Sequence, residues 1–488
     1  MSITSLPAEL VSDICGYLGV PDWCARRLTC RFLFINLRDA FANRHFNSIS
    51  VLVTSDGLGQ LQELAAHDTL HSRVQELWIV PELFEGYCHV DYSIFKHYRF
   101  IRSAHNDQPP ESPVVEAYYA AYKAAVADHL DLLHSDGLGD ILTGCLKRFV
   151  NLTSIGIRYR PTSKRDGLTS LGSRRLRRQL GYHPVYPMQF HYVPRRLGSV
   201  HTLAFMALSK SLMAADRKVK KLTTCGSYYC GLEPTSLTLT PAQWGSLLTP
   251  VEKPAELHLC FNILQPPNAD LEFIGDVLTV VAPKLAVLTF SLYDTKNRMK
   301  PCYFPEPSQG IHFTQLVELH LRKIEVTYDT LETFLLTAAP TLKVLTMVSL
   351  GLADLATSNP SFTSKVTEIW QKIRDFLRDR LSLRFLSIRN LFYAGNPMRV
   401  NDALRELSGT PDPHDRHLTV FDADRARVSF REWANQLGLE PRPDICPRPS
   451  SLSAPQPLPM PPEPHGCFRP PWRRRNNQEN QASPGQRQ

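Results

Sequence analysis

The chain of 488 residues is long enough for two or three domains, or for one long array of repeats. Its hydrophobic content of 43% and charged content of 21% are ordinary for a globular protein, and it contains no apolar run of about 18 residues that would suggest a membrane span. The net charge of +8 is unevenly placed, because residues 158–183 carry +7 and residues 441–488 carry +4, which leaves −3 for the rest. The body is therefore not basic, and neither nucleic acid nor a membrane is an expected partner.

The first 37 residues predict two short amphipathic helices. In the first, Pro7 and Glu9 suit the opening turn, and Gly19 and Pro21 are expected to end the helix. Its apolar residues recur at helical spacing: Leu6, Leu10, Ile14, Tyr17 and Leu18. The second stretch places the following apolar residues on one side: Leu28, Phe32, Ile35 and Leu37. Helices this short cannot bury a core of their own, so they must pack against something else.

This segment resembles an F-box over about the first 45 residues, without a gap. The residues that carry the resemblance keep the order and spacing of the family pattern: Leu6-Pro7, Glu9-Leu10, Ile14, Tyr17-Leu18, Asp22, Cys30-Arg31 and Phe32. One departure is Trp23, which stands where Leu is commoner but is still apolar. The alternative is an ordinary N-terminal helical hairpin that caps the following domain.

The resemblance implies a partner. An F-box docks on a Skp-type linker subunit, which bridges to a cullin scaffold and a ubiquitin-conjugating enzyme. By position, the residues expected to bind the linker are Leu6, Pro7, Leu10, Ile14, Leu18, Trp23, Leu28, Cys30 and Phe32. Some of them are expected to hold the hairpin together instead, and the sequence does not separate the two groups.

Beyond the N-terminal helices, a weak motif of the form apolar-x-x-Leu/Ile-x-apolar recurs, and its last step has the alternation of a β-strand. The copies are Val74/Leu77/Ile79, Leu152/Ile155/Ile157, Val200/Leu203/Phe205, Leu285/Leu288/Phe290, Leu316/Leu319/Leu321, Leu342/Leu345/Met347 and Leu383/Leu386/Ile388, with a partial copy at Leu257/Leu259. Ala282-Pro283 and Ala339-Pro340 each mark the end of a helix just before a strand. This pattern looks like a degenerate leucine-rich-repeat array, in which each unit buries its apolar side against its neighbours. The alternative is a general α/β domain with Leu-rich buried strands.

The sequence therefore predicts an α/β protein in three parts. Residues 1–46 form an all-α F-box, and residues 47–440 form an irregular leucine-rich-repeat-like solenoid that recognises a substrate. Two insertions interrupt the solenoid, one at about 87–136 with a helix over 114–133, and one at about 158–194 with a basic cluster at 174–178. Residues 441–488 are rich in Pro and basic, and predict a disordered tail.

No catalytic or cofactor motif is recognisable. His67 and His71 are four residues apart but have no third ligand nearby, and no Walker loop, G-x-S-x-G or G-x-G-x-x-G occurs, so no metal, cofactor or enzyme activity is expected. The 11 Cys are an odd, scattered number, typical of reduced thiols in the cytoplasm or nucleus. The resemblance to the F-box family implies a non-catalytic receptor of a Skp-cullin-F-box ubiquitin ligase, and the degenerate repeats and Pro-rich tail look like those of the large set of fungal F-box proteins. The alternatives are a binding scaffold that acts without ubiquitin transfer, and an enzyme whose site is assembled from distant residues.

Overall fold

The computed structural model describes most of the chain up to Pro441. The described residues are 6–18, 20–81, 95, 112–158, 170–180, 197–224, 231–233, 240–263, 268–294, 302–304, 311–353, 362–393, 396–400, 418–424, 428–435 and 439–441. Residues 1–441 form one compact unit. Residues 442–488 of the predicted tail, and residues 87–94, 96–111, 159–169 and 181–194 of the two predicted insertions, lie outside the described residues.

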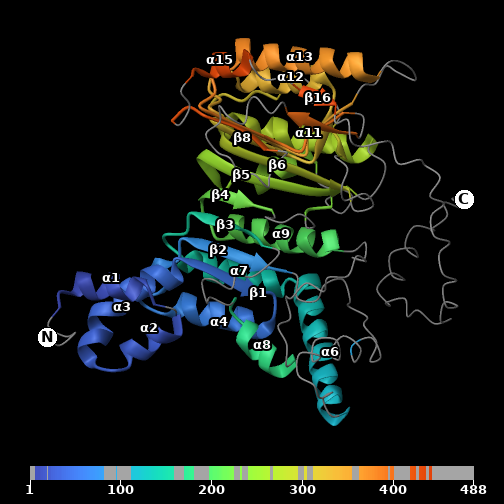
Figure 1. The fold of residues 1–488 in the computed structure, drawn as a ribbon. Coiled ribbons are helices and arrows are strands. Elements are labelled where there is room, and N and C mark those ends of the chain that lie inside the picture. Colours follow the sequence, from blue (N-terminus) through green and yellow to red (C-terminus); the bar gives the residue numbers. More distant parts are fainter. Residues whose placement is uncertain are drawn as a thin grey trace, which may run out of the picture. The chain divides into compact units, whose positions relative to one another are not determined.

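One large sheet dominates this unit, and neighbouring strands follow one another in chain order (Figure 1). Its strands are β1 (Ser48–Leu52), β2 (Glu76–Val80), β3 (Ser154–Ile157), β4 (Val219–Thr223), β5 (Val251–Ile263), β6 (Leu285–Asp294), β8 (Glu318–Arg322), β10 (Val344–Val348), β12 (Phe385–Arg389) and β15 (Leu418–Asp422). All of these pairings are parallel except the last, because β15 runs antiparallel to β12. The fold is therefore α/β with a large, mostly parallel sheet.

A second, smaller sheet continues from the ends of three of these strands. It is made of β7 (Cys302–Tyr303), β9 (Ile324–Val326), β11 (Gly351–Leu352), β13 (Phe392–Tyr393), β14 (Asn396–Val400) and β16 (Leu439–Pro441). Lys323, Ser349 and Asn390 join β8 to β9, β10 to β11 and β12 to β13, and each has a left-handed φ of 54–56°. That conformation turns the chain sharply from one sheet into the other.

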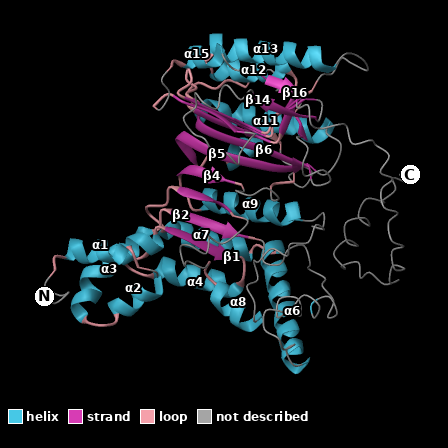
Figure 2. Cartoon of the chain, viewed as in Figure 1, coloured by secondary structure: helices cyan, strands magenta, loops and turns pink. Residues whose placement is uncertain are grey.

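Helices connect the strands (Figure 2). They are α1 (Ala8–Gly16), α2 (Val20–Arg27), α3 (Arg31–Phe46), α4 (Ser55–Ala66), η2 (His71–Arg73), α6 (Ser112–His134), α7 (Gly137–Arg148), α8 (Ser173–Leu180), α9 (Leu197–Ala214), α10 (Pro241–Leu247), α11 (Asn268–Val281), η5 (Ala282–Lys284), α12 (Tyr328–Ala338), α13 (Phe362–Arg380) and α15 (Phe430–Asn435). The predicted helix over 114–133 is confirmed as α6, and the predicted break at Ala282-Pro283 is confirmed as η5 before β6.

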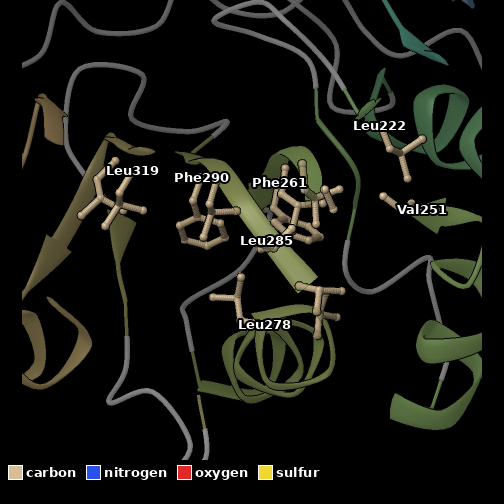
Figure 3. Close-up of a cluster of buried hydrophobic side chains, with 14 of the residues drawn as sticks. Leu222, Val251, Phe261, Leu278, Leu285, Phe290 and Leu319 are labelled. Atoms are coloured by element: carbon tan, nitrogen blue, oxygen red, sulfur yellow. The ribbon is translucent and has the colours of Figure 1, made fainter. Parts of the chain in front are cut away.

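The core lies on one face of the large sheet. Strand register places one row of apolar side chains across it: Leu77, Ile155, Leu222, Leu257, Leu288, Leu319, Leu345 and Leu386. Helices α4, α7, α9, α11, α12 and α13 bury residues in the same cluster. Figure 3 shows part of it, where Leu278 of α11 lies near Leu285 of β6. The motif predicts that six of its residues lie on adjacent parallel strands facing one shared core, and this is confirmed for Leu319, Leu321, Leu345, Met347, Leu386 and Ile388.

The prediction of a leucine-rich-repeat solenoid is wrong. The units between strands do not repeat: strand length varies from 4 residues in β3 to 13 in β5, and the connecting helices vary from 7 residues in α10 to 23 in α6. The antiparallel β15 and the second sheet also lie outside any such repeat. Leu-rich strands recur because a parallel sheet buries its strands against helices, which requires large aliphatic side chains on each strand. This requirement is enough to produce the motif.

One predicted strand is a helix. The motif copy Val200/Leu203/Phe205 lies on α9, and the strand that fills its place in the sheet is β4. The buried apolar residues of α9 are Ala204, Phe205, Leu208 and Leu212, which recur at helical spacing. A short Leu-x-Phe step fits a period of 2 or of 3.6 equally well, so the motif could not distinguish them.

Candidate partner-binding site

The F-box-like segment folds into three helices, which we call the N-terminal helical unit (α1, α2 and α3). Pro7 caps α1 from outside the helix, where its missing N–H is not needed. Pro21, which was predicted to end the first helix, instead lies in the first turn of α2 beside Asp22. Both positions suit their residues, because proline is tolerated in a first helical turn and an acid there faces the positive end of the helix dipole.

A small core holds the unit together. Its buried residues are Val11, Cys15, Trp23, Leu33 and Leu37. The Trp23 ring packs edge-on against Phe41 at 5.9 Å and His45 at 5.3 Å between ring centroids, and the Arg44 guanidinium lies 5.6 Å from the Trp23 centroid. Leu37 was predicted to share a side with Leu28, Phe32 and Ile35, but it lies on the opposite, buried side.

The same helices expose many apolar side chains. Leu10, Ile14 and Tyr17 recur at i, i+4 and i+7 along α1 and form one solvent-facing stripe, with Leu10 50% and Ile14 40% exposed. Leu28, between α2 and α3, is 83% exposed. With these we group the exposed apolar residues of α3, and the exposed apolar set is Leu10, Ile14, Tyr17, Leu28, Phe32, Phe34 and Ile35. Among the described residues, the other large exposed apolar side chains are scattered: Val114, Val150, Met213, Val317 and Leu336.

The structure divides the predicted linker-binding residues into three groups. Pro7, Leu10, Ile14, Leu28 and Phe32 are exposed. Leu6, Leu18 and Cys30 are half-buried and pack against the unit's core, while Trp23 is a core residue. Phe34 is also exposed, although it is not part of the F-box pattern. Its exposure could have been inferred from the helical spacing of Leu33 and Leu37, which turns Phe34 away from the core.

The N-terminal helical unit joins the α/β body through polar contacts and through Phe46 at the end of α3, which packs against the large core. The backbone carbonyl of Asn47 accepts from the N–H groups of Gln75 and Glu76, at 2.9 Å each. The Arg73 guanidinium donates to the Asn43 amide oxygen at 3.0 Å and to Asp39 at 3.2 Å. A hollow of about 340 Å³ lies at this junction, and its lining is polar: Asn43, Asn47, Ser72, Arg73, Gln75 and Asn151.

A group of ionisable side chains elsewhere bears on the enzyme alternative. On the face of the sheet opposite the core, the carboxylate of Glu256 accepts from Lys221 and lies 2.8 Å from His258 Nε2. Burial raises the pKa of Glu256, but the bonds from Lys221 and His258 outweigh it and hold that pKa below its usual value. Burial also lowers the pKa values of His258 and His320. Each imidazole lies beside a carboxylate two residues away on its own strand, which is an arrangement of local imidazole–carboxylate pairs along a sheet face.

No family model matches the chain, and no curated protein matches it. The resemblance to the F-box family therefore rests on the residues quoted above. None of the helices in the described residues is both long and apolar enough to cross a membrane.

Proposed function

We propose that this chain is a non-catalytic substrate-recognition subunit of a Skp-cullin-F-box ubiquitin ligase. The N-terminal helical unit docks on a Skp-type linker, and the α/β body that follows binds a target protein. The receptor works by raising the local concentration of that target near the ubiquitin-transfer machinery. Its place of action is the cytoplasm, the nucleus or both.

The exposed stripe on α1 carries this proposal. Leu10, Ile14 and Tyr17 leave apolar surface in water on a unit whose core is already filled by Val11 and Cys15. Concentrated exposed apolar side chains of this kind are typical of a protein interaction site. Two of them, Leu10 and Ile14, also occupy positions that the F-box resemblance assigns to linker contact.

The stripe suggests a sharp test with purified linker. In a titration against a Skp-type linker subunit, replacing Leu10 and Ile14 together by Ala should weaken binding by about 2–4 kcal/mol, as expected for interface hot spots. These two side chains are better targets than Leu6, which packs against the unit's core and would also affect folding. The matched control replaces Val150 and Leu336 by Ala, because both are similarly exposed but lie outside the N-terminal helical unit. Equal affinity of the Leu10/Ile14 variant and the wild-type chain would contradict the docking assignment.

A second measurement separates the receptor from a scaffold. If the chain is a receptor, its linker-bound form should also recruit cullin and shorten the lifetime of a co-purifying partner. The Leu10/Ile14 variant should lengthen that lifetime again. Linker binding without any change in partner lifetime would favour an adaptor that acts without ubiquitin transfer.

A further inference from the structure

Helix α8 is held firmly at the edge of the large sheet. Leu171, just before it, pairs with Val51 of the edge strand β1, through bonds to Ser50 (2.8 Å) and Leu52 (3.2 Å). Ser173, Leu176 and Leu180 are buried. The two leucines pack in a cluster with residues of β1, β2 and α6, and Figure 1 shows α8 near α6 and α4. The helix is therefore a fixed part of the fold with one buried side.

Its other side is strongly basic. Arg174, Arg175, Arg177 and Arg178 are all exposed. Arg175 forms an ion pair with Asp56 at 2.9 Å. Within the part of the chain that the structure describes, the other three have no ion pair, and we call them the arginine stripe: Arg174, Arg177 and Arg178.

The arginine stripe is unfavourable for the isolated chain. Residues at i, i+3 and i+4 lie on one helix face about 5–6 Å apart, so the three positive charges repel each other. Arg174 also lies in the first turn of α8, at the positive end of the helix dipole, where a cation is disfavoured. A negatively charged ligand would relieve both effects.

We propose that the arginine stripe binds an acidic peptide segment of a partner protein. Guanidinium groups pair with carboxylates through two parallel N–H···O bonds, and the folded helix places three of these groups on one face. The site uses different residues from the linker-docking set, so it stands independently of the proposed function.

Two other interpretations of the basic cluster fit the structure less well. A nuclear-import receptor that binds residues 174–178 as an extended chain would have to unfold α8, because Leu176 in the middle of this segment is buried. A nucleic acid would need basic surface beyond the stripe. The first turn of α4, next to the stripe, instead carries the acidic Asp56. The carboxylate of Asp128 on α6 also lies there, where it accepts a hydrogen bond from the backbone N–H of Ser55.

The test uses the full chain and a fluorescently labelled oligo-glutamate peptide, followed by anisotropy at low and physiological salt. We expect binding that weakens with salt, and a loss of at least about tenfold in affinity when Arg174, Arg177 and Arg178 are replaced together by Glu. The control variant replaces Lys147, Arg148 and Lys210 by Glu. It has the same change in charge at exposed positions of α7 and α9, and should bind within about twofold of wild type.

Three outcomes would overturn the proposal. They are a wild-type chain that does not bind the peptide, an equal loss in the two variants, or tighter binding to an oligo-uridine or an anionic vesicle at the same salt. Replacing the three arginines by Lys guards against misfolding as a trivial cause of lost binding. That variant keeps the charge without the fork geometry, and it should bind with an affinity between those of the wild type and the Glu variant.

Discussion

His129 on α6 is the buried ionisable side chain with the clearest cost for the fold in acid. Its Nδ1 lies 2.8 Å from the backbone carbonyl oxygen of Val53, at the end of β1. Burial lowers its pKa from 6.5 to about 4. The unfolded chain therefore binds a proton at this site at higher pH than the folded chain does, and stability must fall as the pH drops from 6.5 towards 4.

We expect acidification from pH 7 to pH 4.5 to remove about 2–3 kcal/mol of folding free energy through His129 alone. Replacement of His129 by Asn keeps a donor near Val53 but cannot take up the proton, so this variant should lose less stability over the same range. Denaturant unfolding at the two pH values measures the difference. His134→Asn, on the exposed end of the same helix, serves as control. Parallel pH curves for wild type and His129→Asn would refute the assignment.

At the same scale, the sequence revealed the apolar residues of α1 but not which of them face the core. Leu10 and Val11 are equally apolar, and only packing makes one exposed and the other buried. Gly156 is a similar case. A Cβ there would lie 2.6 Å from the Thr223 backbone oxygen and 3.0 Å from the Trp78 ring. Because this crowding comes from neighbouring strands, the local sequence does not predict that position 156 requires glycine.

At the scale of elements, the Leu-rich motif located six strands of the large sheet, β2, β3, β6, β8, β10 and β12, and its partial copy located β5. It succeeded there because the inward row needs a large aliphatic residue on each strand. It failed on α9, where an apolar helix fits the same short motif, and it missed the short strands of the second sheet. Strands of two or three residues contain too few positions for alternation to be visible.

The same row supports a prediction on stability. Leu345 of β10 lies between Leu319 and Leu386 and is fully buried. Replacing Leu345 by Ala should lower the free energy of unfolding by about 2–5 kcal/mol, because the cavity cannot collapse between two strands that are themselves packed. Thr346→Ala is the matched control, since this neighbour points to the opposite face and should change stability by less than about 0.5 kcal/mol. Chemical denaturation compares the two, and similar losses would show that the row is not the core.

At the scale of the whole molecule, the N-terminal helical unit and the α/β body have separate cores. The buried cluster of α1–α3 contains five residues, whereas most of the sheet and its helices share one large cluster, with a smaller one where α6 and α8 pack against β1 and β2. The contacts between the N-terminal helical unit and the body are partly polar, through Arg73, Asn47 and the hollow at the junction, and partly apolar, because Phe46 of α3 packs against the large core and against Phe41. Apart from Phe46, the smaller unit depends on the five buried residues of its own core, which is little apolar burial.

The two separate cores predict that α1–α3 unfold locally more often than the central strands of the sheet. Backbone amides of α1 and α3 should exchange with solvent deuterium faster than those of β5 and β6, because a core of five residues supports only a low free energy of local opening. A saturating Skp-type linker should slow exchange in α1–α3 and leave β5 and β6 unchanged, since a ligand stabilises the unit that it binds. The Leu10/Ile14 variant should lose the linker-dependent protection. Hydrogen exchange read out by mass spectrometry follows all of these segments at once. If α1–α3 were protected as strongly as β5 and β6 in the free chain, the two cores would have to unfold together, and the exposed apolar stripe would belong to a rigid part of one cooperative domain.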